Sequence, residues 1–236
     1  MQPSFLPWIG YLDLIDQSDA FVFLDDVQFE KQSWQQRNRL RAKDNLLWLT
    51  IPILRKGKFG QKINEVMIND IRFKEKHIKT IKQCYVKSEY YELYNSEIIN
   101  NYEKLESNAS LSEFNIQLIR WLCEKFGIST EIYVSSELNC SGARSELLIN
   151  ICKKIESRQY LSPYGASNYL LEDAEKYMDN NIDVYIQNYS HPVYEQVYTP
   201  FISHASAIDL LFNYGPDSMD VVRTGRNKPA LLEKRI

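Results

Sequence analysis

The segment that decides the fold spans residues 130–187 and reads TEIYVSSELNCSGARSELLINICKKIESRQYLSPYGASNYLLEDAEKYMDNNIDVYIQ. Short apolar runs typical of buried strands alternate in it with amphipathic runs of helical length. A strand, a helix and a second strand in this order favour a right-handed crossover and a parallel sheet. We therefore expect strands at 130–134, 159–162 and 182–187, and helices at 143–155 and 166–178.

The segments on either side add further elements to this α/β pattern. Ser110 and Glu113 form a capping-box pattern at the start of one expected helix. The stretch 73–106 contains neither proline nor glycine and predicts two helices. We therefore expect one α/β domain over residues 1–236, with a mainly helical insertion at about 73–106. The further strands are expected at 20–24, 46–54 and 62–68, and the further helices at 8–16, 111–126 and 203–213.

The composition excludes several classes of protein. The chain has 236 residues, 44% of them hydrophobic, and a net charge of −3, which favours a folded domain over a general nucleic-acid binder. The four cysteines are widely spaced, without a CxxC pair or a zinc-type Cys/His pattern, which indicates mostly buried thiols in a reducing compartment. No apolar run reaches membrane-spanning length. We expect a cytoplasmic protein with no nucleic-acid partner, no transmembrane segment and no metal site.

The loop at 3–11 is the first candidate for ligand binding. Pro3, Pro7 and Gly10 punctuate it, and it leads into a helix expected to begin near Trp8. The backbone N–H groups of a helix N-terminus attract anions, and a glycine allows a ligand to approach closely. The alternative is a proline-rich connection that its aromatic and aliphatic side chains fix in the core.

Two carboxylates, Asp25 and Asp26, directly follow the strand expected at 20–24. The carboxyl ends of strands in open α/β sheets carry ligand sites, so the pair predicts a general base, a cation ligand or a contact to a ligand hydroxyl. The alternative is a solvated turn, or an ion-pair partner for a nearby arginine.

The segment 28–41 mixes amides, basic groups and aromatic rings. Arg37 and Arg39 are suited to grip a phosphate or a carboxylate through paired hydrogen bonds. Phe29 or Trp34 is suited to stack on a sugar or a base. The alternative is an amphipathic surface segment, which is the usual fate of a charge run.

The turns after the later strands give two more candidates. Ser162 and Gly165 lie at a strand-to-helix turn whose small residues and hydroxyl groups suit a phosphate or a sugar hydroxyl. His191 lies just beyond the last strand of the expected sheet and is the best acid–base candidate by location. His77 is expected on the surface of a lysine-rich helix, and His204 in local capping.

Blocks of sequence near both ends of the chain, with others between them, form specific motifs. They are Gln2-Pro3, Leu6-Pro7-Trp8, Gly10-Tyr11, Asp25-Asp26-Val27-Gln28-Phe29, Arg37-Asn38-Arg39, Trp48-Leu49-Thr50, Tyr160-Leu161-Ser162, His191-Pro192, Tyr194, Gln196 and Ile208-Asp209-Leu210-Leu211-Phe212-Asn213. Together these blocks resemble the WbqC-like family over nearly the whole chain. That family is associated with bacterial O-antigen and other surface-polysaccharide clusters, and its members have been suggested to transfer glycine or another acyl group to a sugar.

The resemblance implies a transferase of surface-polysaccharide biosynthesis. Its substrate would be a nucleotide-linked amino sugar, which receives a glycyl or similar acyl group, and ATP or an activated acyl donor is the expected co-reactant. The candidate catalytic residues are Asp25, Asp26 and His191. The candidate substrate-binding residues are Gln2, Trp8, Gly10, Tyr11, Gln28, Arg37, Ser162, Gly165, Tyr194, Gln196 and Asn213.

Two alternative functions stay open, namely an ATP-dependent ligase or nucleotidyltransferase-like enzyme, and a non-catalytic accessory protein of a polysaccharide assembly complex. Trp8-Ile9-Gly10-Tyr11 is similar to the HxGH signature of nucleotidyltransferases, with both histidines replaced. This second resemblance implies a Rossmann-like, mostly parallel sheet with helices on both faces. The replaced histidines argue against direct adenylyl transfer.

The N-terminus departs from the family pattern. Family members usually carry a short apolar strand ahead of the block at 2–11, whereas here Gln2 directly follows Met1. The neighbours of such a strand would lose a ladder partner. A truncated start and a compromised copy are both consistent with the sequence.

Overall fold

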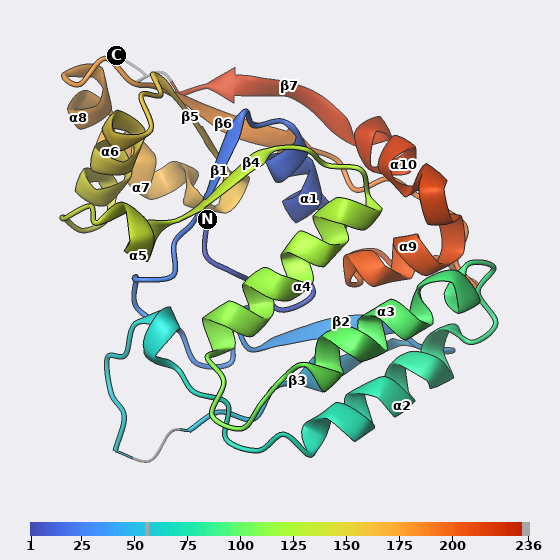
Figure 1. Ribbon diagram of the computed structural model, residues 1–236. Helices are drawn as coiled ribbons and strands as arrows, with labels where there is room; N and C mark the ends of the chain where they lie inside the picture. Colours follow the sequence, from blue (N-terminus) through green and yellow to red (C-terminus); the bar gives the residue numbers. More distant parts are fainter. Residues whose placement is uncertain (55–56, 233–236) are drawn as a thin grey trace.

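The computed structural model describes residues 1–54 and 57–232, and over these residues it shows a mixed α/β fold with three small sheets (Figure 1). The helices are α1 (Ile9–Asp16), α2 (Phe73–Tyr85), α3 (Tyr91–Glu103), α4 (Leu111–Lys125), α5 (Ser135–Leu138), α6 (Ser145–Lys154), α7 (Ser167–Glu172), α8 (Ala174–Met178), α9 (Ala207–Tyr214) and α10 (Ser218–Thr224). The strands are β1 (Ala20–Phe23), β2 (Arg37–Arg41), β3 (Leu46–Thr50), β4 (Glu131–Val134), β5 (Gln159–Ser162), β6 (Asp183–Tyr189) and β7 (Arg226–Leu231).

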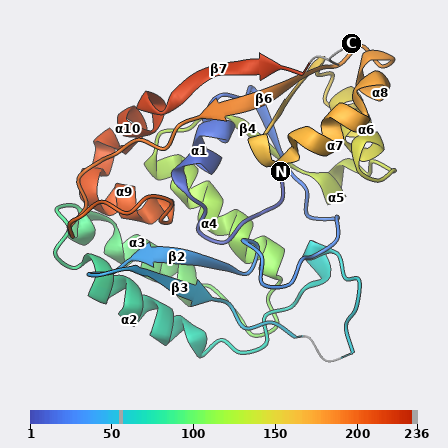
Figure 2. The same ribbon diagram turned by 180° about the vertical axis from the view of Figure 1, so that it is seen from behind.

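Two parallel strand pairs confirm the predicted alternation of strands and helices. β1 pairs with β4, with Phe21 opposite Ile132. β5 pairs with β6, with Tyr160 opposite Val184, and α7 and α8 form the connection between these two strands (Figure 2). β7 adds an antiparallel strand to the other edge of β6.

The two parallel pairs do not join into one sheet, which corrects the predicted Rossmann-like arrangement. An open cavity of about 750 Å³ lies between the edges of β1 and β5. Its walls include Leu14 of α1, Ile151 of α6 and Tyr185 of β6. The sheet is therefore interrupted at the place where a continuous parallel sheet would carry another strand.

Met1 occupies one end of this cavity in the manner of a parallel strand. Its amino group donates to the carbonyl of Val22 at 2.5 Å, and its own carbonyl accepts the N–H of Leu24 at 2.9 Å. In a parallel ladder this pair of bonds places Met1 opposite Phe23. Burial lowers the pKa of the Met1 amino group to about 5, because the charged form loses its hydration. No described strand lies along the rest of this edge of β1.

Strand β2 lies in the segment 28–41, for which the sequence analysis predicted no strand, and it forms a β-hairpin with β3. β2 runs antiparallel to β3, with Arg39 opposite Trp48. Asn38 and Leu40 of β2 are buried, so Arg37 and Arg39 share the other face of the strand. The charge run concealed a strand because its arginines alternate with buried residues.

Two other strand predictions needed correction. The strand expected at 62–68 is a 3₁₀ turn at Ile63–Glu65 that is flanked by isolated bridges. The strand expected at 46–54 ends at Thr50, because Pro52 has no N–H to donate to a ladder.

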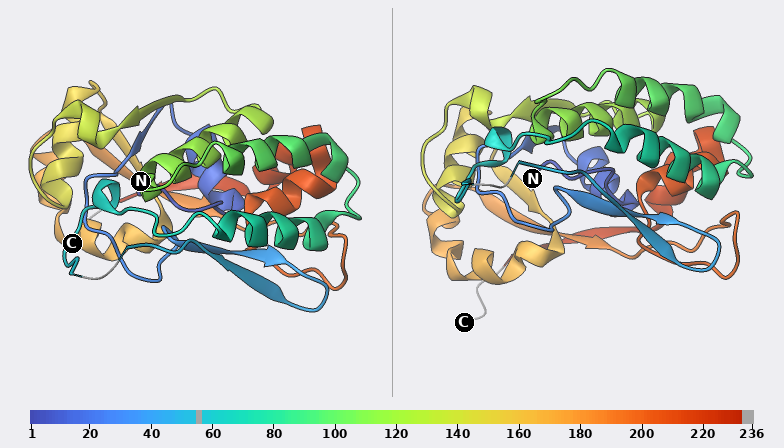
Figure 3. Two further views of the ribbon diagram at one scale, coloured as in Figure 1. Left: turned by 60° about the horizontal axis from the view of Figure 1, so that its bottom comes forward. Right: turned by 90° about the horizontal axis from the view of Figure 1, so that it is seen from below.

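Helices α2 and α3 are the two helices predicted over 73–106, and they lie side by side next to α4 (Figure 3). Ser110 begins α4 as the sequence predicted. Its Oγ accepts the N–H of Glu113 at 3.4 Å, which satisfies one of the free donors at the start of the helix.

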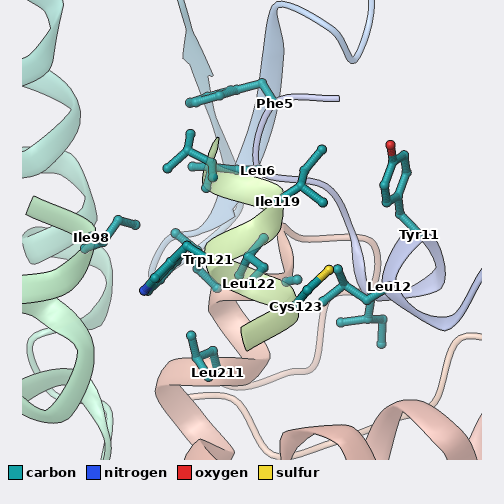
Figure 4. Close-up of a cluster of buried hydrophobic side chains, with 14 of the residues drawn as sticks. Phe5, Leu6, Tyr11, Leu12, Ile98, Ile119, Trp121, Leu122, Cys123 and Leu211 are labelled. Atoms are coloured by element: carbon teal, nitrogen blue, oxygen red, sulfur yellow. The ribbon is translucent and has the colours of Figure 1, made fainter. Parts of the chain in front are cut away.

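Helix α4 runs through the larger hydrophobic core (Figure 4). Its Ile119 and Leu122 are fully buried and cluster with Leu12 of α1, Ile98 of α3 and Leu211 of α9. A second, smaller core consists of side chains of α6, α7, α8 and β6. No helix in the part of the chain that the structure describes has the length and apolar character needed to cross a membrane.

Ion pairs connect the C-terminal elements to α1. Arg226 Nε donates to Asp13 Oδ1 at 2.7 Å, and Arg223 Nη2 donates to Asp16 Oδ1 at 2.9 Å. The helix predicted at 203–213 is α9, which begins only at Ala207. The residues before it are irregular and, as described below, contribute to a pocket.

The interrupted sheet predicts that an added strand stabilises the protein. A fusion of five alternating valine and isoleucine residues ahead of Met1 supplies the cavity with a parallel strand and converts the buried amine into a peptide N–H. We expect the Tm to rise by about 5 °C, because burial of apolar side chains outweighs the ordering of a short segment. Calorimetry measures this change.

A matched extension of the same length, rich in proline and serine, also replaces the amine by a peptide N–H but cannot form a ladder, so it should raise the Tm less. An equal rise with both extensions would contradict the strand geometry of the cavity.

Candidate functional site

A pocket of about 230 Å³ opens between the N-terminal loop, the start of α1, strand β2 and the residues before α9. Figure 2 shows the N-terminal loop passing between α1 and β2. We call this cavity the Trp8 pocket. It is lined by Met1, Ser4, Pro7, Trp8, Tyr11, Trp34, Asn38, Arg39 and His204.

Buried amides hold the N-terminal loop in place. Asn38 Nδ2 donates to the carbonyls of Phe5 at 3.0 Å and Leu6 at 2.8 Å. Asn115 Nδ2 donates to the carbonyl of Pro3 at 3.1 Å. Because these buried carbonyls find buried donors, the loop is fixed without regular secondary structure.

The indole of Trp8 forms one wall of the pocket and covers the first turn of α1. A Cβ atom on Gly10 would lie 2.2–2.6 Å from three of the indole carbons, so any larger residue here would displace the indole. The Trp8 ring stacks on His204 and His191, with centroid distances of 5.2 and 5.9 Å. Trp8 and Tyr11, which stand where an HxGH motif has its histidines, both line the pocket.

Both ring nitrogens of His191 are engaged. Nδ1 lies 2.8 Å from the carbonyl of Pro192, and Nε2 accepts the N–H of His204 at 3.1 Å. This pattern fixes a neutral ring with its proton on Nδ1. Burial lowers the pKa of His191, which favours the same neutral form. His191 thus orients the backbone of His204, and its own catalytic role stays a prediction.

His204 is the residue that sequence reasoning missed. Its backbone is left-handed, with φ of +62°, and Arg39 Nη2 donates to its carbonyl at 3.3 Å. Its Nδ1 lies 2.8 Å from Ser203 Oγ, while its Nε2 has no hydrogen-bond partner among the described residues. Desolvation, followed by the charge of Arg39, lowers the pKa of His204 and favours a neutral imidazole. No local sequence pattern signals this turn.

Two arginines of β2 stand against two tryptophans at the edge of the pocket. The Trp34 and Trp48 rings have centroids 5.5 Å apart and planes inclined by 29°. Arg37 Cζ lies 4.4 Å from the centroid of Trp48, and Arg39 Cζ lies 5.2 Å from that of Trp34. We call this set the Arg–Trp ledge. Basic and stacking groups of the segment 28–41 therefore do lie together, and the substrate contact expected of Arg37 stays a prediction.

Asp25 and Asp26 lie at the end of β1 and bind the start of α5. Asp25 accepts hydrogen bonds from Ser136 Oγ at 2.7 Å, from Ser136 N–H at 3.0 Å and from Ser135 Oγ at 3.1 Å. Asp26 also accepts from Ser135 Oγ. Through these bonds the two carboxylates hold the N-terminus of α5 against the end of β1. Neither carboxylate lines the Trp8 pocket, and their catalytic role stays a prediction.

Three predicted binding residues lie away from the pocket. Ser162 is fully buried, whereas Gly165 and Gln28 are exposed, and none of them lines the Trp8 pocket. Gln2 does lie beside it, because its carbonyl accepts the hydroxyl of Tyr11 at 2.9 Å.

Tyr194, Gln196 and Asn213 belong to a buried polar network around Asp209. Tyr194 Oη and Gln196 Nε2 donate to Asp209 Oδ2 at 2.7 and 2.8 Å, and Asn213 Nδ2 donates to the Asp209 carbonyl at 2.7 Å. The fully buried Arg41 donates to Gln196 Oε1 at 3.1 Å. The network holds the irregular segment that carries the two stacked histidines.

The Trp8 pocket combines a positive field with a neutral base. Arg39 and the N-terminus of α1 favour an anionic ligand, and Nε2 of His204 is available to accept a proton. In the part of the chain that the structure covers, no three His, Cys, Asp or Glu side chains come together in a way that could hold a metal ion. The arrangement suits proton transfer within a negatively charged ligand.

Comparison with known proteins assigns the chain to a protein family. The model of the WbqC-like protein family matches residues 2–221. The chain belongs to this family. The uncharacterized protein Rv1507c of Mycobacterium tuberculosis is 30% identical to it over 224 residues, which cover 94% of this chain and 96% of the relative. No solved structure matches this WbqC-like chain.

The contact between Trp8 and Gly10 predicts that Gly10→Ala distorts the pocket. The new methyl group would overlap the indole, so the ring must move away from His204. We expect a loss of about 1–3 kcal/mol in the free energy of unfolding and an altered tryptophan emission spectrum. Gly165→Ala is the control, because that position is open and has an ordinary φ. Equal effects of the two substitutions would disprove the packing role of Gly10.

The buried Asp209 carboxyl predicts a pH-dependent stability. Burial is the main cause that raises the pKa of Asp209 from 3.8 to about 6. The native state therefore keeps a proton that the unfolded state releases between about pH 4 and 6, and stability falls as the pH rises through this window. We expect this group to remove about 2–3 kcal/mol from the free energy of unfolding between pH 4 and 7.

Asp209→Asn tests this assignment by chemical denaturation at several pH values. An asparagine oxygen can still accept from Tyr194 and Gln196, but the side chain no longer titrates. The fall in stability should therefore disappear in this variant and persist in Asp44→Asn, which changes an exposed residue. An unchanged pH slope in Asp209→Asn would refute the assignment.

Proposed function

We propose that the protein transfers a glycyl or similar acyl group to the amino group of a nucleotide-linked amino sugar during surface-polysaccharide biosynthesis. The observation that carries this proposal is the imidazole of His204, whose Nε2 is unengaged within the described residues and which lines a cationic, aromatic pocket. Membership of the WbqC-like family, with its association with surface-polysaccharide clusters, supports the pathway.

His204 has the features of a general base. Its neutral Nε2 would take the proton from the acceptor amine while nitrogen forms a bond to the acyl carbon. The same proton would then pass to the leaving group as the bond between the acyl carbon and its donor breaks. His191 would keep this base oriented through its hydrogen bond to the His204 N–H.

The walls of the pocket are suited to a phosphorylated sugar. The partly exposed indole of Trp8 offers an apolar surface of the kind on which sugars stack. Arg39 and the N-terminus of α1 add positive charge on the side of the phosphate. A nucleotide-linked sugar combines both requirements in one molecule.

Mass spectrometry tests the reaction directly. The purified protein is incubated with UDP- or dTDP-linked amino sugars and either a glycyl thioester or ATP with free glycine. We expect a product that is heavier by one glycyl unit. No mass change with any donor would overturn the proposal, and release of AMP or pyrophosphate without acyl transfer would favour a ligase or nucleotidyltransferase reaction instead.

His204→Asn is expected to lower kcat by about 10²- to 10⁴-fold, the usual contribution of a general base. Asparagine tolerates the left-handed backbone of this position, so the Tm should stay close to that of the wild type. His204→Gly leaves room for added imidazole, which should restore part of the rate. Full activity in either variant would exclude His204 as the base.

A further inference from the structure

The Arg–Trp ledge carries positive charge that the fold leaves unpaired. Among the described residues, the side chain of Arg37 makes no hydrogen bond and no ion pair, and its guanidinium lies over the ring of Trp48. The Nε atoms of Arg37 and Arg39 are both buried without a hydrogen-bond partner. The Nη groups of Arg37 are neither buried nor hydrogen-bonded within the described residues, so they are the donors that a ligand with acceptor oxygens can reach.

Other buried or half-buried arginines of the fold find their partners within the chain. Arg41 donates to backbone carbonyls at 198 and 200, at 3.1 and 2.7 Å. Arg226 pairs with Asp13, and Arg223 pairs with Asp16. The two arginines of the ledge stand out against this background because no described carboxylate approaches them.

The contacts with the tryptophan rings leave donor groups of the ledge available to a ligand. The N–H groups at the edge of a guanidinium match the oxygens of a phosphate, and the Arg37 Cζ lies 4.4 Å from the Trp48 centroid without a carboxylate beside it. Arg37 and Arg39 are two residues apart on one face of β2, which separates them by about 7 Å along the strand. Two neighbouring phosphates fit such a spacing better than one carboxylate does.

We propose that the Arg–Trp ledge is the subsite for the diphosphate of an activated sugar. Arg37 and Arg39 each grip one phosphate, and Trp34 and Trp48 hold the guanidinium planes in position. This assignment rests on the proposed function in one respect, because that function places the sugar of the same ligand in the Trp8 pocket. Arg39 links the two sites, because it lines the pocket and donates to the carbonyl of His204.

Inorganic pyrophosphate is the probe, because it contains the diphosphate without a sugar or a base. Titration calorimetry gives the Kd, and tryptophan fluorescence reports on Trp34 and Trp48. We expect the wild type to bind, Arg37→Gln to weaken binding at least tenfold, and Arg37→Lys to fall between the two. Arg72→Gln is the matched control, since Arg72 is exposed and already paired with Asp70; it should bind like the wild type.

The failure of this subsite can be told apart from the failure of the proposed function. No binding of pyrophosphate by the wild type, an unchanged Kd in an Arg37→Gln, Arg39→Gln double variant, or an equal loss in Arg72→Gln would overturn the subsite. Binding that depends on Arg37, in a protein that transfers no acyl group, would support the subsite and reject the proposed reaction. His204→Asn should bind pyrophosphate like the wild type.

A second binding experiment distinguishes a nucleotide-linked sugar diphosphate from a lipid-linked one. UDP-N-acetylglucosamine and a farnesyl-diphosphate-linked N-acetylglucosamine share the diphosphate and differ in the group beyond it. Arg37→Gln should weaken both to the same extent if the ledge holds the diphosphate, and unequal effects would contradict that. Tighter binding of the lipid-linked sugar would keep the subsite and overturn the nucleotide part of the proposed function.

Discussion

The amides of Asn38 and Asn115 supply the interaction on which the rest of the site depends. They donate to buried carbonyls of the N-terminal loop and thereby fix it against β2 and α4. A buried carbonyl without such a donor would cost about 1–3 kcal/mol, which would drive the loop toward water. Because the donors are present, the start of α1, strand β2 and the residues before α9 meet around one pocket.

The local features of the fold follow from the sequence better than its long-range assembly does. The alternation at 130–187 predicted the parallel pairing of β5 with β6, and Ser110 predicted the start of α4. Strand β2 was hidden, because arginines at alternate positions resemble a solvated charge run. The separation of the two parallel pairs was not predictable, since the spacing between strands far apart in sequence leaves no local pattern.

The same division applies to the candidate site. The prolines and the glycine of the segment 3–11 predicted that Trp8 and Tyr11 lie at the start of a helix, and both residues line the pocket. His191 and Asp25 were chosen by their place after strands, but their partners come from remote segments that no local pattern names. His204 escaped prediction because a single left-handed residue, rather than a motif, directs it to the pocket.

The gap between the two parallel pairs has an effect on cooperativity. Strands β5, β6 and β7 with α6, α7 and α8 have a small core of their own and share no ladder with β1. Their attachment to α1 includes the ion pair of Arg226 with Asp13 and the hydrogen bond from Gln187 Nε2 to the Gly10 carbonyl. Amide hydrogens of β5 and β6 can therefore exchange with solvent through partial opening of this unit, whereas those buried beneath α4 exchange only when the whole chain unfolds.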